Sequence, residues 1–290
     1  MQQYLFNVAG HIFSVIAEAD IPGTLPNLKP FITDSDTKQP LFYIVVDNSV
    51  IPEWRGKRIG TFPCPSATFD VYKEADGAYR ILVSDEKGTP CAFIQSDKEY
   101  KRFTIATRGT EQDKNFGLNN SIMVIYTLCS APLKTLLVHS SVVENNGHAY
   151  MFLGASGRGK STHSDLWTKH ICGSTLINDD NPVIRIADDG TPTVYGTPWS
   201  GKRPIYKNTH YPIGGIAVIE QNKENTIRKE SIPCAFGIML GSCSTLKFDE
   251  RVHMHICSTI AAVLERIAVH TLACRPDREA AQLSSKTFGL

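Results

Sequence analysis

The sequence feature that most constrains the fold is a glycine-rich stretch, Gly154–Thr162, which fits the pattern G-x-x-x-x-G-K-[ST]. An apolar run at residues 149–153 leads into it, and residues 162–167 read as the start of a helix that leaves it. Between a strand and a helix, such glycines let backbone N–H groups and the helix N-terminus point at one anion. The alternative is an ordinary glycine-rich turn beside a lysine. We favour a nucleotide site, because the motif and its context agree.

The residues expected to hold the phosphates all lie in this stretch. Lys160 would add a point charge, and the hydroxyl of Ser161 suits Mg²⁺, which prefers oxygen ligands. The predicted contacts to the nucleotide are Gly154, Ser156, Gly157, Arg158, Gly159, Lys160, Ser161 and Thr162. The expected cofactors are therefore ATP, or another nucleoside triphosphate, and Mg²⁺. The sequence does not separate ATP from GTP.

A hairpin is predicted immediately before the glycine-rich stretch. Residues 136–143 are strand-like, Asn146-Gly147 is a strong hairpin turn, and the returning strand is the one that enters the stretch. The strand that feeds the phosphate loop should therefore pair antiparallel with its predecessor. This expectation argues against the ordinary P-loop ATPases and GTPases, which are built from parallel βαβ crossovers.

Two aspartates end the next predicted strand. A short apolar run at residues 174–177 is followed by Asn178, Asp179 and Asp180. One carboxylate at this position can hold Mg²⁺, and the other can take a proton from an attacking hydroxyl. Because Asn and Asp favour turns and Pro182 follows, a plain β-turn is the alternative.

A second loop, at residues 196–203, combines two glycines and Trp199 with two cations, Lys202 and Arg203. The cations are predicted to contact phosphate groups, and the alternative is a packed tryptophan with two solvated side chains. Further on, residues 222–225 are close to the guanine-reading N-K-x-D of GTPases, but Asn225 replaces the aspartate. We expect a polar turn there, and we expect His163 to be a surface residue of the loop helix.

The rest of the sequence bounds the domain organisation. A chain of 290 residues is long enough for two domains. Residues 1–110 contain short alternating runs separated by turns and predict an antiparallel β-rich region, with loops at 25–40 and 49–66. Residues 111–290, which contain the glycine-rich stretch, are predicted to form a nucleotide-binding domain. The expected fold class is therefore α/β, or α+β, with a mixed sheet.

Charge and cysteine content narrow the classes of function. Lys and Arg number 30 against 29 Asp and Glu, and this formal charge of +1 gives no reason to expect nucleic acid or a membrane as a partner. Eight cysteines without a C-x-x-C pair are typical of free thiols in a reducing compartment. No signal peptide is evident, and no apolar run makes a good membrane span. We expect a cytoplasmic protein.

The order of these features resembles a known superfamily. In the HPr kinase/phosphorylase and phosphoenolpyruvate carboxykinase superfamily, an antiparallel hairpin leads into G-x-S-G-x-G-K-[ST] and an aspartate pair follows on the next strand. Residues 118–218 of this chain are similar. The resemblance implies a nucleotide-binding core of that type, with Asp179 or Asp180 as base and metal ligand. It also implies that His139, which matches the family's histidine, lies at the phosphates, whereas a core histidine on a sheet is the alternative.

Two functions are open at this point. The first is an ATP- and Mg²⁺-dependent phosphotransferase, resembling HPr (serine) kinase, that phosphorylates a hydroxyl of a protein or a small molecule. The second is a non-catalytic nucleotide-binding scaffold, for example in peptide modification, that keeps the kinase-like pocket. The intact aspartate pair favours the enzyme, and the missing arginine- and asparagine-containing C-terminal signature of HPr kinases favours the scaffold. The hydroxyl acceptor and a homo-oligomeric state are left open.

Overall fold

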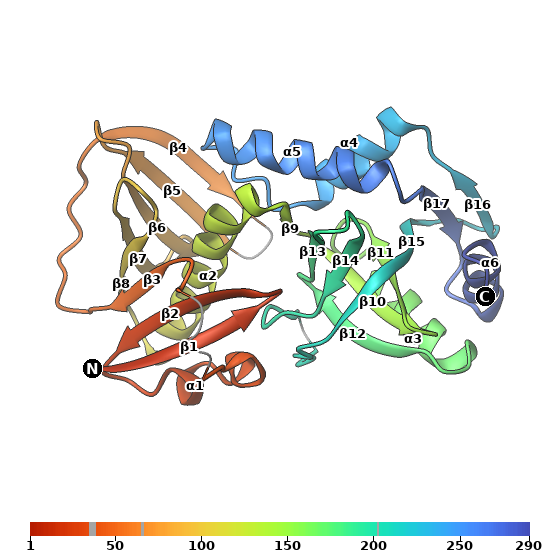
Figure 1. Ribbon diagram of the computed structural model, residues 1–290, viewed down its shortest axis with the longest axis horizontal. Helices are drawn as coiled ribbons and strands as arrows, with labels where there is room; N and C mark the ends of the chain where they lie inside the picture. Colours follow the sequence, from red (N-terminus) through yellow and green to blue (C-terminus); the bar gives the residue numbers. More distant parts are fainter. Residues whose placement is uncertain (35–38, 65–66, 202) are drawn as a thin grey trace. The chain divides into compact units, whose positions relative to one another are not determined.

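The computed structural model describes residues 1–34, 39–64, 67–201 and 203–290. Contacts divide the chain into two compact units, one formed by Met1–Ser130 with Leu246–Val252 and the other by Ala131–Thr245 with His253–Leu290. Each unit contains its own β-sheet, drawn in red to yellow for the first and mainly green to blue for the second (Figure 1). In its described part, the protein has two mixed sheets and few helices, which confirms the predicted α+β class.

The first sheet has the strand order β1-β2-β3-β8-β7-β6-β5-β4 among the described residues. Its strands are β1 (Gln2–Val8), β2 (His11–Ala17), β3 (Tyr43–Val46), β4 (Lys57–Pro63), β5 (Ala67–Lys73), β6 (Tyr79–Asp85), β7 (Pro90–Ser96) and β8 (Arg102–Thr107). The five strands from β4 to β8 form an antiparallel meander. The short strand β3 lies between β2 and β8 and pairs parallel with both, so this sheet is mixed.

Two short helices and one long helix belong to the same unit among the described residues. The short ones are α1 (Ile21–Thr24) and the 3-10 helix η1 (Pro26–Phe31), and the long one is α2 (Glu111–Ser130). The sequence placed α2 at the start of the second region, whereas the structure packs it on β6, β7 and β8 of the first sheet. Its apolar side chains, including Leu118, Ile122 and Ile125, are buried.

Strand β4 corrects the expectation of a loop at residues 49–66. It is the last strand of the sheet, and its side chains are mostly exposed. An edge strand has one face and one hydrogen-bonding side open to water, so it tolerates charged residues and proline. For this reason its sequence lacks the apolar alternation by which strands are recognised.

The second sheet has the order β12-β10-β11-β15-β14-β13-β9 in the described chain, with β17 on β15 and β16 on β17. Its strands are β9 (Thr135–Leu137), β10 (Ser140–Asn145), β11 (His148–Leu153), β12 (Thr175–Asp180), β13 (Val183–Ile186), β14 (Pro192–Tyr195), β15 (His210–Gln221), β16 (Thr226–Lys229) and β17 (Val269–Cys274). The long strand β15 pairs antiparallel with β14 through its first residues and parallel with β11 and β17 through its later ones.

The predicted hairpin before the glycine-rich stretch is confirmed. β10 and β11 pair antiparallel, and the two turn residues between them, Asn146 and Gly147, have φ values of 49° and 76°. Both values lie in the left-handed region that a two-residue hairpin turn requires. His139 lies immediately before the first residue of β10, and β11 pairs parallel with β15 on its other side.

The helices after the glycine-rich stretch are α3 (Lys160–His170), α4 (Ile232–Ser242), α5 (Glu250–Leu264) and α6 (Arg278–Thr287). The strands β16 and β17 lie among these helices in the final third of the chain. A buried cluster that includes Tyr150, Phe152 and Trp167 holds α3 and α6 on the sheet. In the part of the chain that the structure describes, no helix is both long and apolar enough to cross a membrane.

His163 is buried, which corrects the expectation of a surface residue. Because α6 packs against α3, the face of α3 that carries His163 and Trp167 is covered. His163 Nε2 and Trp167 Nε1 lie 3.0 and 2.9 Å from Ser284 Oγ, and the His163 ring meets the Phe152 ring edge-on at 4.6 Å. Burial lowers the pKa of His163 to about 4, so its imidazole is neutral at pH 7.

Mild acid should therefore destabilise the protein through His163. In the unfolded chain a histidine has a pKa of about 6.5. The unfolded state thus binds a proton that the folded state excludes until about pH 4, and stability falls as the pH drops through this window. Between pH 7 and pH 5 the loss should be about 2 kcal/mol. His163→Gln, which keeps a donor for Ser284, should reduce this loss in urea unfolding at the two pH values. An equal pH dependence in both proteins would contradict the assignment.

Candidate functional site

The glycine-rich stretch has the backbone of an anion-binding loop. Gly154, Gly157 and Gly159 have φ values of 143°, 77° and 103°, a region that favours glycine. Gly159 is the N-cap residue of α3, and no side chain caps this helix end. The first N–H groups of a helix have no partner within it and carry its positive dipole end. The loop and the start of α3 can therefore hold a phosphate group.

Lys160 is buried at the base of this loop. Its Nζ lies 2.9 Å from the carbonyl oxygen of Gly154, 3.3 Å from that of Ala155 and 2.8 Å from His139 Nε2. These contacts can use all three ammonium hydrogens. Burial lowers the pKa of Lys160, and the nearby Asp180 and Asp179 partly offset this effect.

His139 joins Lys160 to one of the two aspartates. His139 Nδ1 lies 3.1 Å from Asp180 Oδ1, and the backbone N–H of His139 donates to the carbonyl oxygen of Ser242 at 2.7 Å. Asp180 Oδ2 accepts a hydrogen bond from Asn181 at 2.7 Å. The predicted residues His139, Lys160 and Asp180 thus form one chain of close polar contacts.

Asp179 belongs to a second network. Its Oδ2 accepts from Arg203 Nε at 2.6 Å, and its side chain is only 5% exposed. Arg203 also pairs through Nη1 with Asp165 on α3, and its Nη2 donates to the carbonyl oxygen of Ser161 at 3.4 Å. The guanidinium therefore ties the aspartate at the end of β12 to the first turn of α3.

The charge state of Asp179 follows from these surroundings. Burial by itself raises the pKa of this carboxyl, but hydrogen bonding with Arg203, Ser141 and Ser161 outweighs burial and lowers the pKa below its usual value. The carboxylate is thus ionised at neutral pH. Its Oδ1 is buried and has no hydrogen-bond partner of ordinary geometry among the described residues. An ionised oxygen of this kind beside the Ser161 hydroxyl is a suitable direct or water-mediated ligand for Mg²⁺.

Strand register brings the aspartates to the loop. β10 pairs with β11 on one side and with β12 on the other. Ser140 lies opposite Leu153, the residue before the loop, and also opposite Asp180, while Ser141 lies opposite Asp179. The aspartates are therefore level with the end of β11, the strand that enters the loop. They are the last two residues of β12, so the alternative of a plain β-turn at this position is wrong.

The second loop, residues 196–203, lies against the aspartate pair. The N–H of Gly201 donates to the carbonyl oxygen of Asp179 at 3.3 Å. A Cβ at this position would lie 3.1 Å from that oxygen and 3.3 Å from Asp180 Cβ, so glycine permits the close approach. Trp199 is buried, as the alternative of a packed tryptophan required. Arg203 is engaged with two carboxylates, and Lys202 lies outside the described residues.

Two residues of the site were not singled out from the sequence. Asp165 pairs with Arg203, and Ser141 faces Asp179 and accepts from Ser164 Oγ at 2.7 Å. Asp165 follows Ser161 by one helical turn, a spacing that places both on the same side of α3. This spacing was a usable signal, whereas the place of Ser141 depends on the pairing of β10 with β12.

Within the described ranges, no group of three or more His, Cys, Asp or Glu side chains is arranged to hold a metal ion. The fold and site define an α+β protein in which a glycine loop faces an aspartate pair and a histidine. No family model matches the chain, and no curated protein matches its sequence.

Removal of Arg203 should destabilise the protein more than removal of an exposed arginine. Arg203→Ala leaves the buried Asp179 carboxylate without its cation. We expect a loss of about 2 to 3 kcal/mol, below the cost for a fully buried pair because the Arg203 side chain is 29% exposed. The control Arg228→Ala removes an exposed partner of Glu230 and should cost less than about 1 kcal/mol.

Chemical denaturation of both variants measures the difference in unfolding free energy. Adding Asp179→Asn to Arg203→Ala should restore part of the lost stability, because it removes the unpaired buried charge. Equal effects of the two arginine substitutions would show that the Asp179–Arg203 pair is not coupled to folding.

Proposed function

We propose that the chain is an ATP- and Mg²⁺-dependent phosphotransferase, similar to HPr kinase, that acts on a hydroxyl of a protein or a small molecule. The observation that carries this proposal is the chain of contacts from Asp180 through His139 to Lys160 at an anion-binding loop. Phosphoryl transfer needs positioned positive charge and a proton acceptor close to it. The antiparallel β10–β11 hairpin supports a core of the HPr kinase and phosphoenolpyruvate carboxykinase type.

The loop amides and Lys160 would bind and orient the phosphates. Since the ammonium of Lys160 contacts Gly154, Ala155 and His139, it exchanges at least one of these partners for a phosphate oxygen. The contact with His139 is the one on the side of the aspartates. Exchange of this contact would couple phosphate binding to the hydrogen bond between Lys160 and His139.

Asp179 and Ser161 are the residues that would hold Mg²⁺. The low pKa of Asp179 keeps a negative charge beside the hydroxyl of Ser161, and its buried Oδ1 has no hydrogen-bond partner of ordinary geometry among the described residues. When bound, the ion neutralises charge on the transferring phosphoryl group. Arg203 would keep Asp179 in place through the hydrogen bond to Oδ2.

Asp180 is the better candidate for the base. Its side chain is 31% exposed, against 5% for Asp179, so an acceptor hydroxyl can reach it. The hydrogen bond from Asn181 and the contact with His139 Nδ1 at 3.1 Å orient its carboxylate. A general base must come within hydrogen-bond distance of the proton that it removes, and accessibility therefore decides between the two aspartates.

The loss of Lys160 should weaken phosphate binding. Lys160→Ala removes the ammonium that contacts both the loop carbonyls and His139, so the affinity for ATP with Mg²⁺ should fall by about tenfold or more, the scale of one charge-assisted contact. Isothermal titration calorimetry measures it, with Lys169→Ala, an exposed lysine of the same helix, as the matched control. Unchanged affinity in Lys160→Ala, or no binding to the intact protein, would refute the nucleotide site.

Substitution of the two aspartates should have different effects on the kinetics of phosphoryl transfer. Asp180→Asn should lower kcat by roughly 10²- to 10⁴-fold with little change in nucleotide affinity, because an amide cannot accept the hydroxyl proton. Asp179→Asn should instead raise the Mg²⁺ concentration needed for half-maximal activity. ADP formation, with water or added hydroxyl compounds as acceptor, follows both. Reversed effects would exchange the roles, and tight ATP binding without any turnover would support the nucleotide-binding scaffold instead.

A further inference from the structure

The guanidinium of Arg203 is held by three groups from two elements of the second unit. Its Nε donates to Asp179 Oδ2 at 2.6 Å, its Nη2 donates to the carbonyl oxygen of Ser161 at 3.4 Å, and its Nη1 pairs with Asp165. Asp179 is one of the last two residues of β12, whereas Ser161 and Asp165 lie one helical turn apart on α3. Each of the three nitrogens therefore has a partner of its own.

The pairing of Arg203 with Asp179 uses only one oxygen of the carboxylate. Arginine and carboxylate groups commonly form two parallel hydrogen bonds, in which the planar guanidinium takes both oxygens. Here Ser161 and Asp165 occupy the two terminal nitrogens, so Nε alone is directed to Asp179. Asp179 Oδ1 is buried and has no hydrogen-bond partner of ordinary geometry among the described residues. This oxygen is the one proposed above as a ligand of Mg²⁺.

Asp165 is the partner of Arg203 whose position is hardest to explain by folding stability. Its side chain is 61% exposed, and ion pairs at exposed positions contribute little to the free energy of folding. The contact nevertheless restricts the guanidinium. A group that is held at Nη1 cannot turn to offer a second N–H to Asp179 without breaking the ion pair with Asp165. The exposed carboxylate thus controls how Arg203 meets the buried one.

We infer that Asp165 is a positioning residue of the Mg²⁺ site, which fixes Arg203 so that Asp179 Oδ1 stays free for the cation. The inference rests on the proposed function, because it takes Asp179 as a ligand of the metal. Without Asp165 the guanidinium can turn and bind both oxygens of Asp179, and Mg²⁺ then has to compete with two charge-assisted hydrogen bonds. Nucleotide without metal does not need Asp179 and should bind as before.

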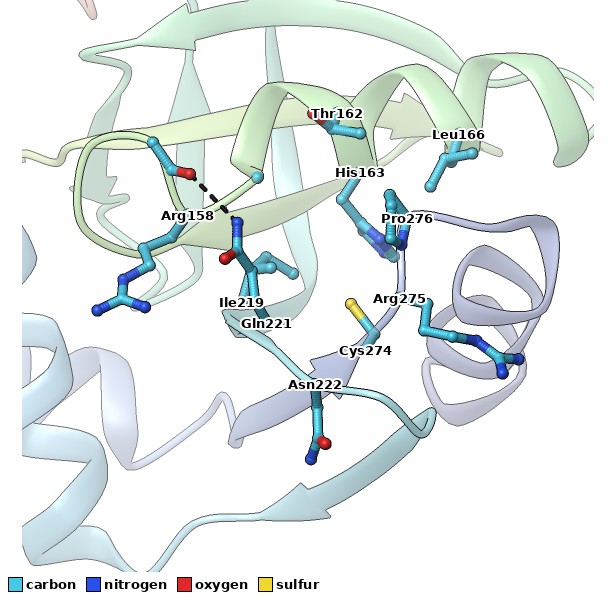
Figure 2. A pocket seen from close by; sticks show the side chains of 12 residues that line it. Arg158, Thr162, His163, Leu166, Ile219, Gln221, Asn222, Cys274, Arg275 and Pro276 are labelled. Atoms are coloured by element: carbon cyan, nitrogen blue, oxygen red, sulfur yellow. Dashed lines mark hydrogen bonds between the residues drawn. The ribbon is translucent and has the colours of Figure 1, made fainter.

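Asp165 lies apart from the cavity beside the glycine loop. A pocket of about 490 Å³ opens at the ends of β15 and β17, and α3 contributes Thr162, His163 and Leu166 to its walls (Figure 2). Asp165 is not among the described residues that line it. Successive residues of a helix differ in direction by about 100°, so the side chain of Asp165 points away from that of Leu166. A substitution of Asp165 should therefore leave this pocket unchanged.

Calorimetry of ATP binding to the full chain, once with Mg²⁺ and once with EDTA, tests the inference. The ratio of the two dissociation constants measures how much the metal tightens binding, and for the wild type we expect about tenfold or more. Asp165→Ala should reduce this ratio to about threefold or less, while the affinity in EDTA and the melting temperature stay near those of the wild type. Asp165→Glu keeps a carboxylate for Nη1 and should restore most of the ratio.

Two further variants separate positioning from other effects of a lost carboxylate. Glu53→Ala is the matched control, because Glu53 is also 61% exposed and pairs with an arginine, Arg55, at 2.6 Å, but in the first unit. It should leave the ratio unchanged. Arg203→Lys keeps a cation for Asp179 but lacks the planar fork that can take both oxygens. Adding Asp165→Ala to Arg203→Lys should therefore have little further effect on the ratio.

The outcomes separate this inference from the proposed function. If Asp165→Ala leaves the ratio unchanged, or weakens ATP binding equally with Mg²⁺ and with EDTA, the positioning role is refuted and the nucleotide site stands. If Asp165→Ala lowers the ratio as strongly in Arg203→Lys as in the wild type, Asp165 acts by its charge alone, and the role is refuted as well. If Mg²⁺ does not tighten ATP binding to the wild type, the metal role of Asp179 and this inference fail together. If ATP does not bind under either condition, the proposed function itself fails.

Discussion

The candidate site depends on the double pairing of β10. This strand forms antiparallel ladders with β11 and with β12, so its register decides which residues of the two outer strands are level. Ser140 lies opposite both Leu153 and Asp180. A slip of one residue would turn every side chain of a strand to the other face. The β10–β11 hairpin and its neighbour β12 therefore bring the glycine loop close to the carboxylates of Asp179 and Asp180.

Two adjacent aspartates acquire different properties because they enter different networks. Asp179 is covered and paired with Arg203, whereas Asp180 is partly open and connected through His139 to Lys160. Neighbouring acids in unlike surroundings can take unlike roles in a reaction. The second loop contributes to this separation, because it carries Arg203 and approaches the pair so closely that a Cβ at Gly201 would make tight contacts with both aspartates.

The sequence was misleading where burial is decided by an element far away in the chain. His163 has polar neighbours along α3, yet it is buried because α6 covers that face. Strand β4 has the composition of a loop, since an edge strand is free of the demand for apolar alternation. For His163 a distant helix decided the burial, whereas for β4 pairing with β5 formed a strand that the local composition did not indicate.

By itself, the sequence determined the turn at Asn146-Gly147, the antiparallel hairpin and the conformation of the glycine loop. These features depend on backbone preferences of a few adjacent residues, which act wherever the segment is placed. Only the tertiary structure decided that Arg203 pairs with Asp179, that His139 links Asp180 to Lys160, and that a pocket lies beyond the loop at β15 and β17. The physical reason is that these contacts join segments separated by tens of residues, and their energies exist only once strand register and helix packing have set the distances.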